Sequence, residues 1–326
     1  MQIIKDIKDL SVSLPVIATP QYLSCNGSID FGYFFEQGMV LPYYIKKILI
    51  FRYIVFPTGV IGKYDKNEEQ IFLENILEHL RKKPGIDFIL MQHATALFNT
   101  YPKGASACHF GTYSLNLTKT EEELFAGLHP KHRNVIKKAK NDGIIISEGS
   151  DNFNDCVLLV QETLKRQGLS YPSIGYFQQL KKNLGENLDF WIARDESMIH
   201  GSAIILWSKG HNSYYLFGGS SGKHHNGALN LLQWEVIRLM KSRSVYTHDF
   251  VGARLNPAKG SKYEGIQRFK ERFGGDLKEG YLWKFPIRKI KYRLYINALK
   301  IKCILKRIEY TGDVIDQEYK RLGLRY

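Results

Sequence analysis

The chain has 326 residues, of which 44% are hydrophobic and 24% are charged, a composition typical of a globular protein with room for one large or two medium domains. Its formal net charge of +14 favours polyanionic partners: nucleic acid, nucleotide-linked substrates or an anionic membrane surface. The four cysteines form no CxxC pair, which is typical of a reduced, cytosolic chain. The opening residues MQIIKDIKDL do not resemble a signal peptide, and no uncharged apolar run approaches the roughly 20 residues of a membrane-spanning helix.

The N-terminal half predicts alternating strands and helices. Residues 54–62, IVFPTGVIG, indicate a strand that enters a Pro-Thr-Gly turn. Apolar residues at helical spacing, with acids early and bases late, predict a helix over 67–83. The runs 86–92 and 111–117 indicate strands, and a strongly basic helix is expected over 130–143.

The second half repeats this pattern of strands covered by helices. The expected elements are helices over 151–167, 173–183 and 226–242, and strands over 189–194, 199–207, 212–218 and 245–251. Each half therefore combines a mixed, mostly antiparallel sheet with flanking helices, which is the α+β class. We expect two domains, residues 1–149 and 150–326, the second of which includes a C-terminal tail.

This tail is strongly basic and is expected to be helical. No acidic residue lies between Gly280 and Ile308. The apolar residues at helical spacing on one side are Ile290, Leu294, Ala298, Ile301 and Leu305. A basic amphipathic helix can lie on an anionic membrane or bind RNA, and it can equally dock on its own domain and leave a basic face in solvent. The sequence leaves these alternatives open.

The strongest chemical pattern combines a small-residue turn with a lysine. The turn FGGSS, residues 217–221, links an expected strand to a helix N-terminus, so the backbone N–H groups of Ser220 and Ser221 are a candidate anion site. Phe269 and Lys270 lie on a short helix further along, and a fixed lysine can stabilise a developing oxyanion. Together these features predict transfer of an acyl group from a phosphate-rich donor.

Several segments resemble, in the same order, the signature of the Fem-type aminoacyltransferases (the FemABX family). They are IVFPTGVIG at 54–62, HPKHRNVIKKAKNDGI at 129–144, FGGSS at 217–221, LLQWEVI at 231–237, HDFVG at 248–252 and GIQRFKERFGG at 265–275. The resemblance covers most of residues 50–285. It implies two tandem GNAT-like domains without the long coiled-coil arm that some members insert.

The resemblance also implies a reaction. Family members transfer an amino acid from aminoacyl-tRNA, their co-substrate, to an amine of a peptidoglycan precursor, and so build the interpeptide bridges of the cell wall. The acceptor is a UDP- or lipid-linked muropeptide, and no other cofactor is implied. Such an aminoacyltransferase would act in the cytoplasm or at the inner face of the plasma membrane, where the basic tail could add a peripheral contact. The oligomeric state does not follow from the sequence.

The resemblance implies two catalytic residues, and the position of Asp249 at a strand end makes it a third candidate. In the family the Phe-Lys pair lies where the acyl ester meets the amine, so Lys270 is expected to stabilise the oxyanion, and Phe269 to wall the channel or orient the ester. Asp249, at the end of an expected strand, either accepts a proton from the attacking ammonium or holds the backbone and Lys270 in place.

Three tyrosines and an arginine are implied as substrate-binding. Tyr214 or Tyr215, together with Tyr176, resembles residues that contact the phosphates of the acceptor, and packing is an equal alternative for them. Family members usually have an arginine one turn before Tyr176, where this chain has Pro172, and this departure puts the UDP- or lipid-linked acceptor in doubt. Arg133 matches a family arginine that either bridges parts of the structure or touches RNA phosphate.

Two other functions stay open. An acetyl-CoA-dependent GNAT N-acyltransferase acting on a cell-envelope amine needs a glycine-rich pyrophosphate loop, and the nearest segment, 223–228, has Asn226 at a required glycine. A non-enzymatic RNA- or membrane-binding protein with the same fold would bind in a salt-sensitive manner without turnover. His224 and His225 lack a third ligand at metal spacing, so no metal site is expected.

Overall fold

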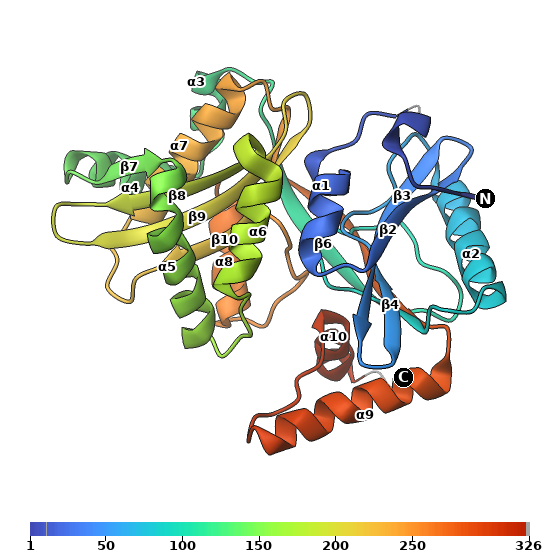
Figure 1. Ribbon diagram of the computed structural model, residues 1–326. Coiled ribbons are helices and arrows are strands. Elements are labelled where there is room, and N and C mark those ends of the chain that lie inside the picture. The colour runs from blue at the N-terminus through green and yellow to red at the C-terminus, as the bar shows by residue number, and fades with distance from the viewer. Residues whose placement is uncertain (11, 324–326) are drawn as a thin grey trace. The chain divides into compact units, whose positions relative to one another are not determined.

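The computed structural model describes residues 1–10 and 12–323, and its contacts divide the chain into two compact units (Figure 1). Unit 1 combines Met1–Gly111 with the chain from Glu279 onward, and unit 2 is Thr112–Lys278. The expected domain division between residues 149 and 150 therefore falls inside unit 2, and the basic tail belongs to unit 1. The chain returns to unit 1 along a late strand, and a return of this kind leaves no local pattern in the sequence.

Unit 1 is built on a sheet with the strand order β1-β2-β3-β4-β5-β12. Strands β4 and β5 run parallel, and the other neighbours run antiparallel. The bounds are β1 (Gln2–Ile4), β2 (Asp30–Glu36), β3 (Met39–Ile48), β4 (Phe51–Val55), β5 (Phe88–Leu90) and β12 (Asp276–Pro286). The pairing of Phe285 on β12 with Ile89 on β5 brings the chain back into this unit.

Consecutive apolar residues give the unit 1 sheet two buried faces, because successive side chains of a strand point to opposite sides. On β2, Phe34 belongs to a core formed with helix α2, whereas the adjacent Tyr33 belongs to a second core formed with α1 and α9. The same division separates Ile54 from Tyr53 on β4. The helices of this unit are α1 (Pro20–Leu23), α2 (Lys66–Lys82), α9 (Lys289–Leu305) and α10 (Val314–Leu322).

Unit 2 has the strand order β6-β11-β10-β9-β8-β7. Strands β10 and β11 run parallel, and the other neighbours run antiparallel. The bounds are β6 (Ser106–Asn116), β7 (Ile145–Glu148), β8 (Leu188–Arg194), β9 (Ile199–Trp207), β10 (Asn212–Ser220) and β11 (Thr247–Asp249). Both units thus combine a mixed, mostly antiparallel sheet with helices, which confirms the α+β class.

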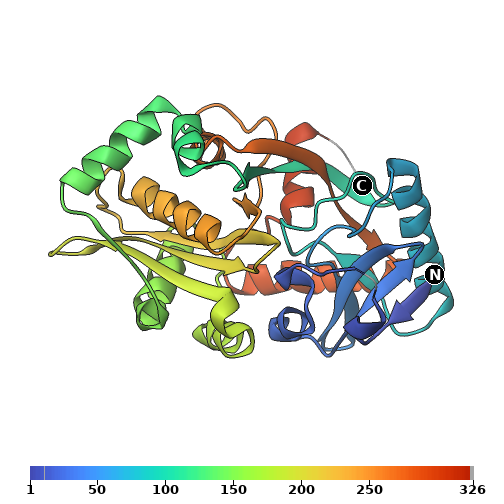
Figure 2. The same cartoon turned by 90° about the horizontal axis from the view of Figure 1, so that it is seen from above.

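Helices cover both faces of the unit 2 sheet. Helices α5 and α6 lie on one face, and α4 and α7 lie on the other, as the turned view in Figure 2 shows. The bounds are α3 (Glu121–Gly127), α4 (Pro130–Asn141), α5 (Phe153–Arg166), α6 (Ile174–Leu184), α7 (Ala228–Ser242) and α8 (Lys262–Glu271). Helix α5 approaches β10 closely at Gly219, where an added Cβ would lie 2.7 Å from the backbone carbon of Leu159.

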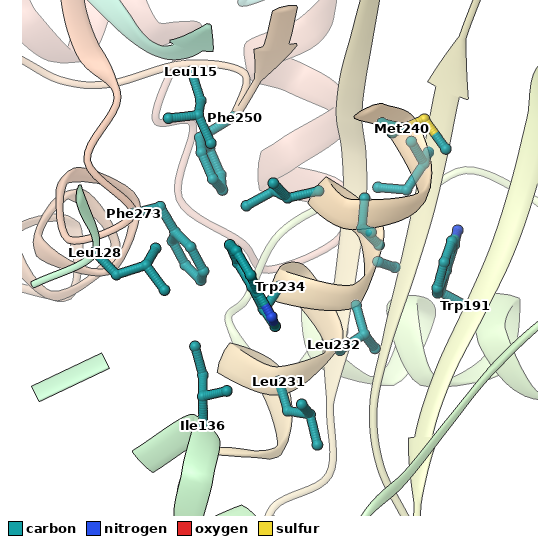
Figure 3. Packing of buried hydrophobic residues seen from close by; sticks show 14 of the residues in the cluster. Leu115, Leu128, Ile136, Trp191, Leu231, Leu232, Trp234, Met240, Phe250 and Phe273 are labelled. Atoms are coloured by element: carbon teal, nitrogen blue, oxygen red, sulfur yellow. The ribbon is translucent and has the colours of Figure 1, made fainter. Parts of the chain in front are cut away.

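Helix α7 is the centre of the unit 2 core. Its residue Trp234 points toward Phe250 and Phe273, while Trp191 of β8 packs on the other side of the helix (Figure 3). Phe250 and Phe273, which follow β11 and α8, stack on each other with ring centroids 5.1 Å apart and share one core with Trp234. This packing positions the turn after β11, from which the site below is built. Within the described ranges, no helix is long and apolar enough to cross a membrane.

Candidate active site

The candidate site begins at the turn that follows β11. Val251 has φ = 51° and Gly252 has φ = 76°, and positive φ is unfavourable for a β-branched residue such as Val251. The turn is held from two sides: the N–H of Val251 donates to Asp249 Oδ1 at 2.7 Å, and Lys270 Nζ donates to the carbonyls of Val251 and Gly252, each at 2.6 Å. The structure thus brings Asp249 and Lys270 together around one strained peptide.

Lys270 is a buried cation on α8. Its exposed fraction is 9%, and burial lowers its pKa to about 8, an effect that the charge of Asp249 partly opposes. An ammonium has three N–H donors, and the hydrogen bonds to Val251 and Gly252 use two of them. The remaining donor and the positive charge can stabilise an oxyanion that forms nearby, because a charge in a low-dielectric site is weakly screened.

Asp249 is tied to the backbone and to a neighbouring strand. Its Oδ1 accepts hydrogen bonds from Thr112 Oγ1 at 2.6 Å and from the N–H of Val251. Burial raises the pKa of this carboxyl, and the two hydrogen bonds and Lys270 act against that rise. Of the two roles expected from the sequence, these contacts favour the one in which Asp249 holds the turn.

Phe269, next to Lys270 on α8, lines an open pocket of about 560 Å³. The pocket is lined by α4, the start of α7 and α8, through Lys131, His132, Val135, Asn226, Asn230, Gly260, Ser261, Glu264, Gly265, Arg268, Phe269 and Arg272. Phe269 packs against His132, with ring centroids 5.6 Å apart. Burial and then the charge of Arg272 lower the pKa of His132 to about 4, so this ring is neutral at pH 7. Lys270, the next residue along α8, is not among the lining residues.

The chemistry of this pocket suits an anion. Lys131, Arg268 and Arg272 supply positive charge, and Arg268 is partly neutralised by Glu264 at 3.3 Å. Helix α7 begins at the pocket with Gly227 as its N-cap, which makes no side-chain capping hydrogen bond. The first N–H of α7, that of Ala228, donates to the His225 carbonyl at 3.2 Å, and the positive end of the helix dipole attracts negative charge. Sequence reading missed the pocket, although Arg268 and Arg272, one helical turn apart on α8, are the signal that could have found it.

The FGGSS turn is not the anion site that the sequence suggested. The N–H of Ser220 donates to Thr163 Oγ1 at 2.9 Å, and the N–H of Ser221 donates to the His200 carbonyl at 3.0 Å. Arg166 Nη2 donates to the carbonyl of Ser220 at 2.8 Å. Both serine N–H groups are thus used within the fold, and Ser220, the last residue of β10, is bonded to α5 through Thr163 and Arg166. Tertiary partners distant in sequence decide this, so the local pattern could not reveal it.

The three candidate tyrosines lie in packed surroundings. Tyr214 is buried, its hydroxyl accepts a hydrogen bond from Asn212 at 3.3 Å, and burial raises its pKa. Burial also raises the pKa of Tyr215 to about 12. Tyr176, on α6, packs edge-to-face against Phe177, with ring centroids 5.4 Å apart. These contacts fit the packing role that the sequence left open for the tyrosines. Phosphate binding by the tyrosines stays a prediction.

Arg133 and the two histidines also have partners within unit 2. Arg133 Nη1 donates to the carbonyls of Ala126 and Leu128 at 2.7 and 2.6 Å, and so caps the end of α3. His225 Nε2 lies 2.9 Å from Asp142, and His224 contacts the carbonyl of Ser221. In the part of the chain that the structure describes, no group of three or more His, Cys, Asp or Glu side chains could hold a metal ion.

Comparison with protein families matches the chain to the FemAB family. The model of the FemAB family matches residues 44–197 and 191–300, which together span most of the chain and include the β11 turn and α8.

Among curated proteins, the chain is similar to enzymes named lipid II:glycine glycyltransferase. It is 26% identical to that of Staphylococcus haemolyticus over 184 residues, which are 53% of this chain and 37% of the relative. It is 31% identical to that of Staphylococcus aureus over 119 residues, which are 33% of this chain and 28% of the relative. The chain thus matches only about a third of the length of these relatives.

Solved structures show the same fold. The crystal structure of FemX superposes with a TM-score of 0.66 at 14% identity and covers 90% of this chain and 99% of FemX. The structure of L-PGS from Bacillus licheniformis superposes with a TM-score of 0.51 at 12% identity and covers 91% of this chain and 99% of L-PGS. At these identities the likeness describes the fold alone.

Proposed function

Because the chain belongs to the FemAB family, we propose that it transfers an aminoacyl group from aminoacyl-tRNA to an amine of a peptidoglycan precursor. Its relatives are named for glycine and lipid II, which makes glycyl-tRNA the first donor to test and a lipid-linked muropeptide the first acceptor.

The observation that carries this proposal is the buried ammonium of Lys270. In aminolysis of the aminoacyl ester, the acceptor nitrogen attacks the ester carbonyl and a tetrahedral oxyanion forms. The intermediate then collapses: the C–O bond to the ribose breaks, the amide remains, and the departing ribose oxygen takes up a proton that the attacking amine has lost. The third N–H donor of Lys270 and its charge suit the oxyanion, whose negative charge exists only during the reaction.

The donor is proposed to contact the basic pocket of unit 2. Lys131, Arg268 and Arg272 around the N-terminus of α7 suit the phosphates of an RNA 3′ end. Asn226 supports RNA over CoA, because its side chain lines the pocket just before the α7 N-cap, where a pyrophosphate loop needs glycine. Acyl-CoA-dependent N-acyl transfer to a cell-envelope amine is the second candidate, since the positive end of the α7 helix dipole could also receive a pyrophosphate.

A transfer assay tests both candidates. Purified protein is mixed with radiolabelled glycyl-, alanyl- or seryl-tRNA and with UDP- or lipid-linked muropeptide, and parallel reactions contain labelled acetyl-CoA. We expect label to move from glycyl-tRNA to the lipid-linked muropeptide. Label that moves from acetyl-CoA and from no tRNA would replace the proposal by the second candidate, and absence of transfer from every donor would overturn both.

A further inference from the structure

Helix α9 docks on unit 1 through its aromatic side. Tyr295 is buried and packs against Phe51 and Phe88, with ring centroids 5.6 and 4.9 Å apart. Tyr292, Ile296 and Leu299 pack against the same core. In Figure 1 the helix lies along the end of β4. The apolar contacts that hold α9 in place therefore come from one side of the helix.

The opposite side of α9 carries a second apolar stripe, which is exposed. The residues of this stripe follow one another at intervals of four, four, three and four, and are Ile290, Leu294, Ala298, Ile301 and Leu305. Ile290 is 73% exposed and Leu305 is 79% exposed. Positions three and four apart share one face of a helix. Sequence reading identified this stripe but could not tell which apolar side docks, and the structure shows that the tyrosine side does.

Positive charge borders the exposed stripe. At about 100° per residue, Arg293 and Lys300 project on one side of it, and Lys291 and Lys302 project on the other. No acidic residue lies between Gly280 and Glu309. Lys291 is paired with Asp87 at 2.8 Å, whereas the remaining bases border an aliphatic surface that they do not cover.

A second group of exposed apolar side chains lies beside α9. The turn between β3 and β4 exposes Ile48, Leu49 and Ile50, and Leu49 is 79% exposed. Bases flank this turn in sequence, at Lys47 and Arg52. The turn is adjacent to α9, because Phe51, the next residue, stacks edge-on against Tyr295 of the helix.

We propose that α9, supported by the β3–β4 turn, binds the surface of an anionic phospholipid bilayer. The aliphatic stripe would enter the headgroup region while the bordering lysines and arginines contact lipid phosphates. An RNA surface fits less well, because phosphates suit the bases but offer no apolar region to cover Ile290, Ile301 and Leu305. This proposal goes beyond the transfer reaction, since lipid binding can be measured with neither donor nor acceptor present.

Vesicle flotation tests the proposal with the full chain. The wild-type protein is expected to float with vesicles of phosphatidylcholine mixed with phosphatidylglycerol, and to bind vesicles of phosphatidylcholine alone much more weakly. The combined change Ile290→Ser, Ile301→Ser and Leu305→Ser should weaken binding about tenfold or more, because it removes apolar area that enters the headgroup region. Ile71→Ser, at an exposed apolar position of α2 in the same unit, is the matched control and should leave binding unchanged.

Charge provides the second arm of this test. Arg293→Gln with Lys300→Gln should weaken binding to the anionic vesicles, and added salt should weaken wild-type binding, because both reduce attraction to the lipid phosphates. Lys320→Gln, at an exposed position of α10, is the control. Circular dichroism verifies that each variant keeps its helices. Equal binding of the vesicles by the wild type and the stripe variant would overturn the proposal. A stripe variant that loses tRNA binding but keeps vesicle binding would also overturn it, and would assign the stripe to RNA.

Discussion

Two lysines are buried in the described structure, one in each unit, and their surroundings differ in kind. Lys284, in unit 1, lies 2.9 Å from Asp313 and 2.6 Å from Asp316. Burial alone would lower the pKa of Lys284, but the two carboxylates more than reverse this effect, and the net pKa is raised. Lys270, in unit 2, instead donates to two neutral carbonyls, and burial lowers its pKa to about 8.

The difference separates a lysine that stabilises the fold from one that is available for chemistry. The charge of Lys284 is matched by acids that also cap α10, since Asp313 and Asp316 form its capping box. The charge of Lys270 is held by dipoles, and the one acid nearby, Asp249, is engaged with Thr112 and Val251. A cation that is not fully neutralised by the protein attracts a negative charge that develops in a bound substrate.

The largest effect is expected for Lys284→Met. This change leaves Asp313 and Asp316 facing each other in a partly buried site without their cation, so the free energy of unfolding should fall by about 3–5 kcal/mol. Urea denaturation followed by circular dichroism measures it. Lys320→Met on α10, which removes the exposed ion pair of Lys320 with Glu309, is the control and should cause no measurable change. Equal stability of both variants would show that the acids do not depend on Lys284.

The next effect is expected for Lys270→Met, and it should appear in turnover. Loss of an oxyanion donor should lower kcat about 10²–10³-fold, while the affinity for tRNA stays unchanged, because Lys270 does not line the basic pocket. The carbonyls of Val251 and Gly252 lose their donor, so stability should also fall by about 1–3 kcal/mol. The folded fraction of Lys284→Met should keep wild-type turnover. Unchanged turnover of Lys270→Met would reject the proposed role.

The pH dependence separates the two lysines further. The rising deprotonation of the acceptor amine speeds the reaction of wild type and of Lys270→Met alike, so the ratio of their rates isolates Lys270. This ratio should fall above about pH 8, where the ammonium loses its proton. Stability should change in the opposite direction. The pKa of Lys270 is about 8 in the folded chain, below its ordinary value of 10.5, so the unfolded chain binds the proton more tightly. The contribution of Lys270 to the free energy of unfolding therefore becomes more favourable as pH rises from about 8 towards 10.5. A ratio that stays constant above pH 8 would contradict the oxyanion role.

Elements with a strong local pattern were predicted closely from the sequence. The expected helix over 67–83 is α2 (Lys66–Lys82), and the expected strand over 199–207 is β9 (Ile199–Trp207). Periodicity and turn residues decide such elements locally. The expected domain division differs from the two compact units of the structure, because the return of the chain to unit 1 depends on the pairing of Phe285 with Ile89, nearly two hundred residues apart.

The site was only partly predictable. The Phe269–Lys270 pair was identified from its neighbours in sequence, but the hold of Lys270 on Val251 and Gly252 depends on how α8 packs against the β11 turn. The role of Ser220 and Ser221 was missed for the same reason, since Thr163 and His200 compete for their N–H groups. The local sequence pattern identifies residues with suitable functional groups. Tertiary hydrogen bonds then decide which of these groups remain available to bind a substrate.

The smallest effect is expected for Asp249→Asn, which tests the acid beside Lys270. If Asp249 holds the turn, the amide oxygen can still accept from Thr112 and Val251, and turnover should fall roughly tenfold or less, whereas loss of a general base costs about a hundredfold or more. The charge of Asp249 raises the pKa of Lys270. The rate of Asp249→Asn, divided by that of the double variant with Lys270→Met, should therefore begin to fall at a lower pH than the same ratio does for the wild type. Thr112→Val keeps the charge and is the control, because it removes one donor to the same oxygen. A hundredfold loss with the pH dependence unmoved would make Asp249 the base rather than a positioning residue.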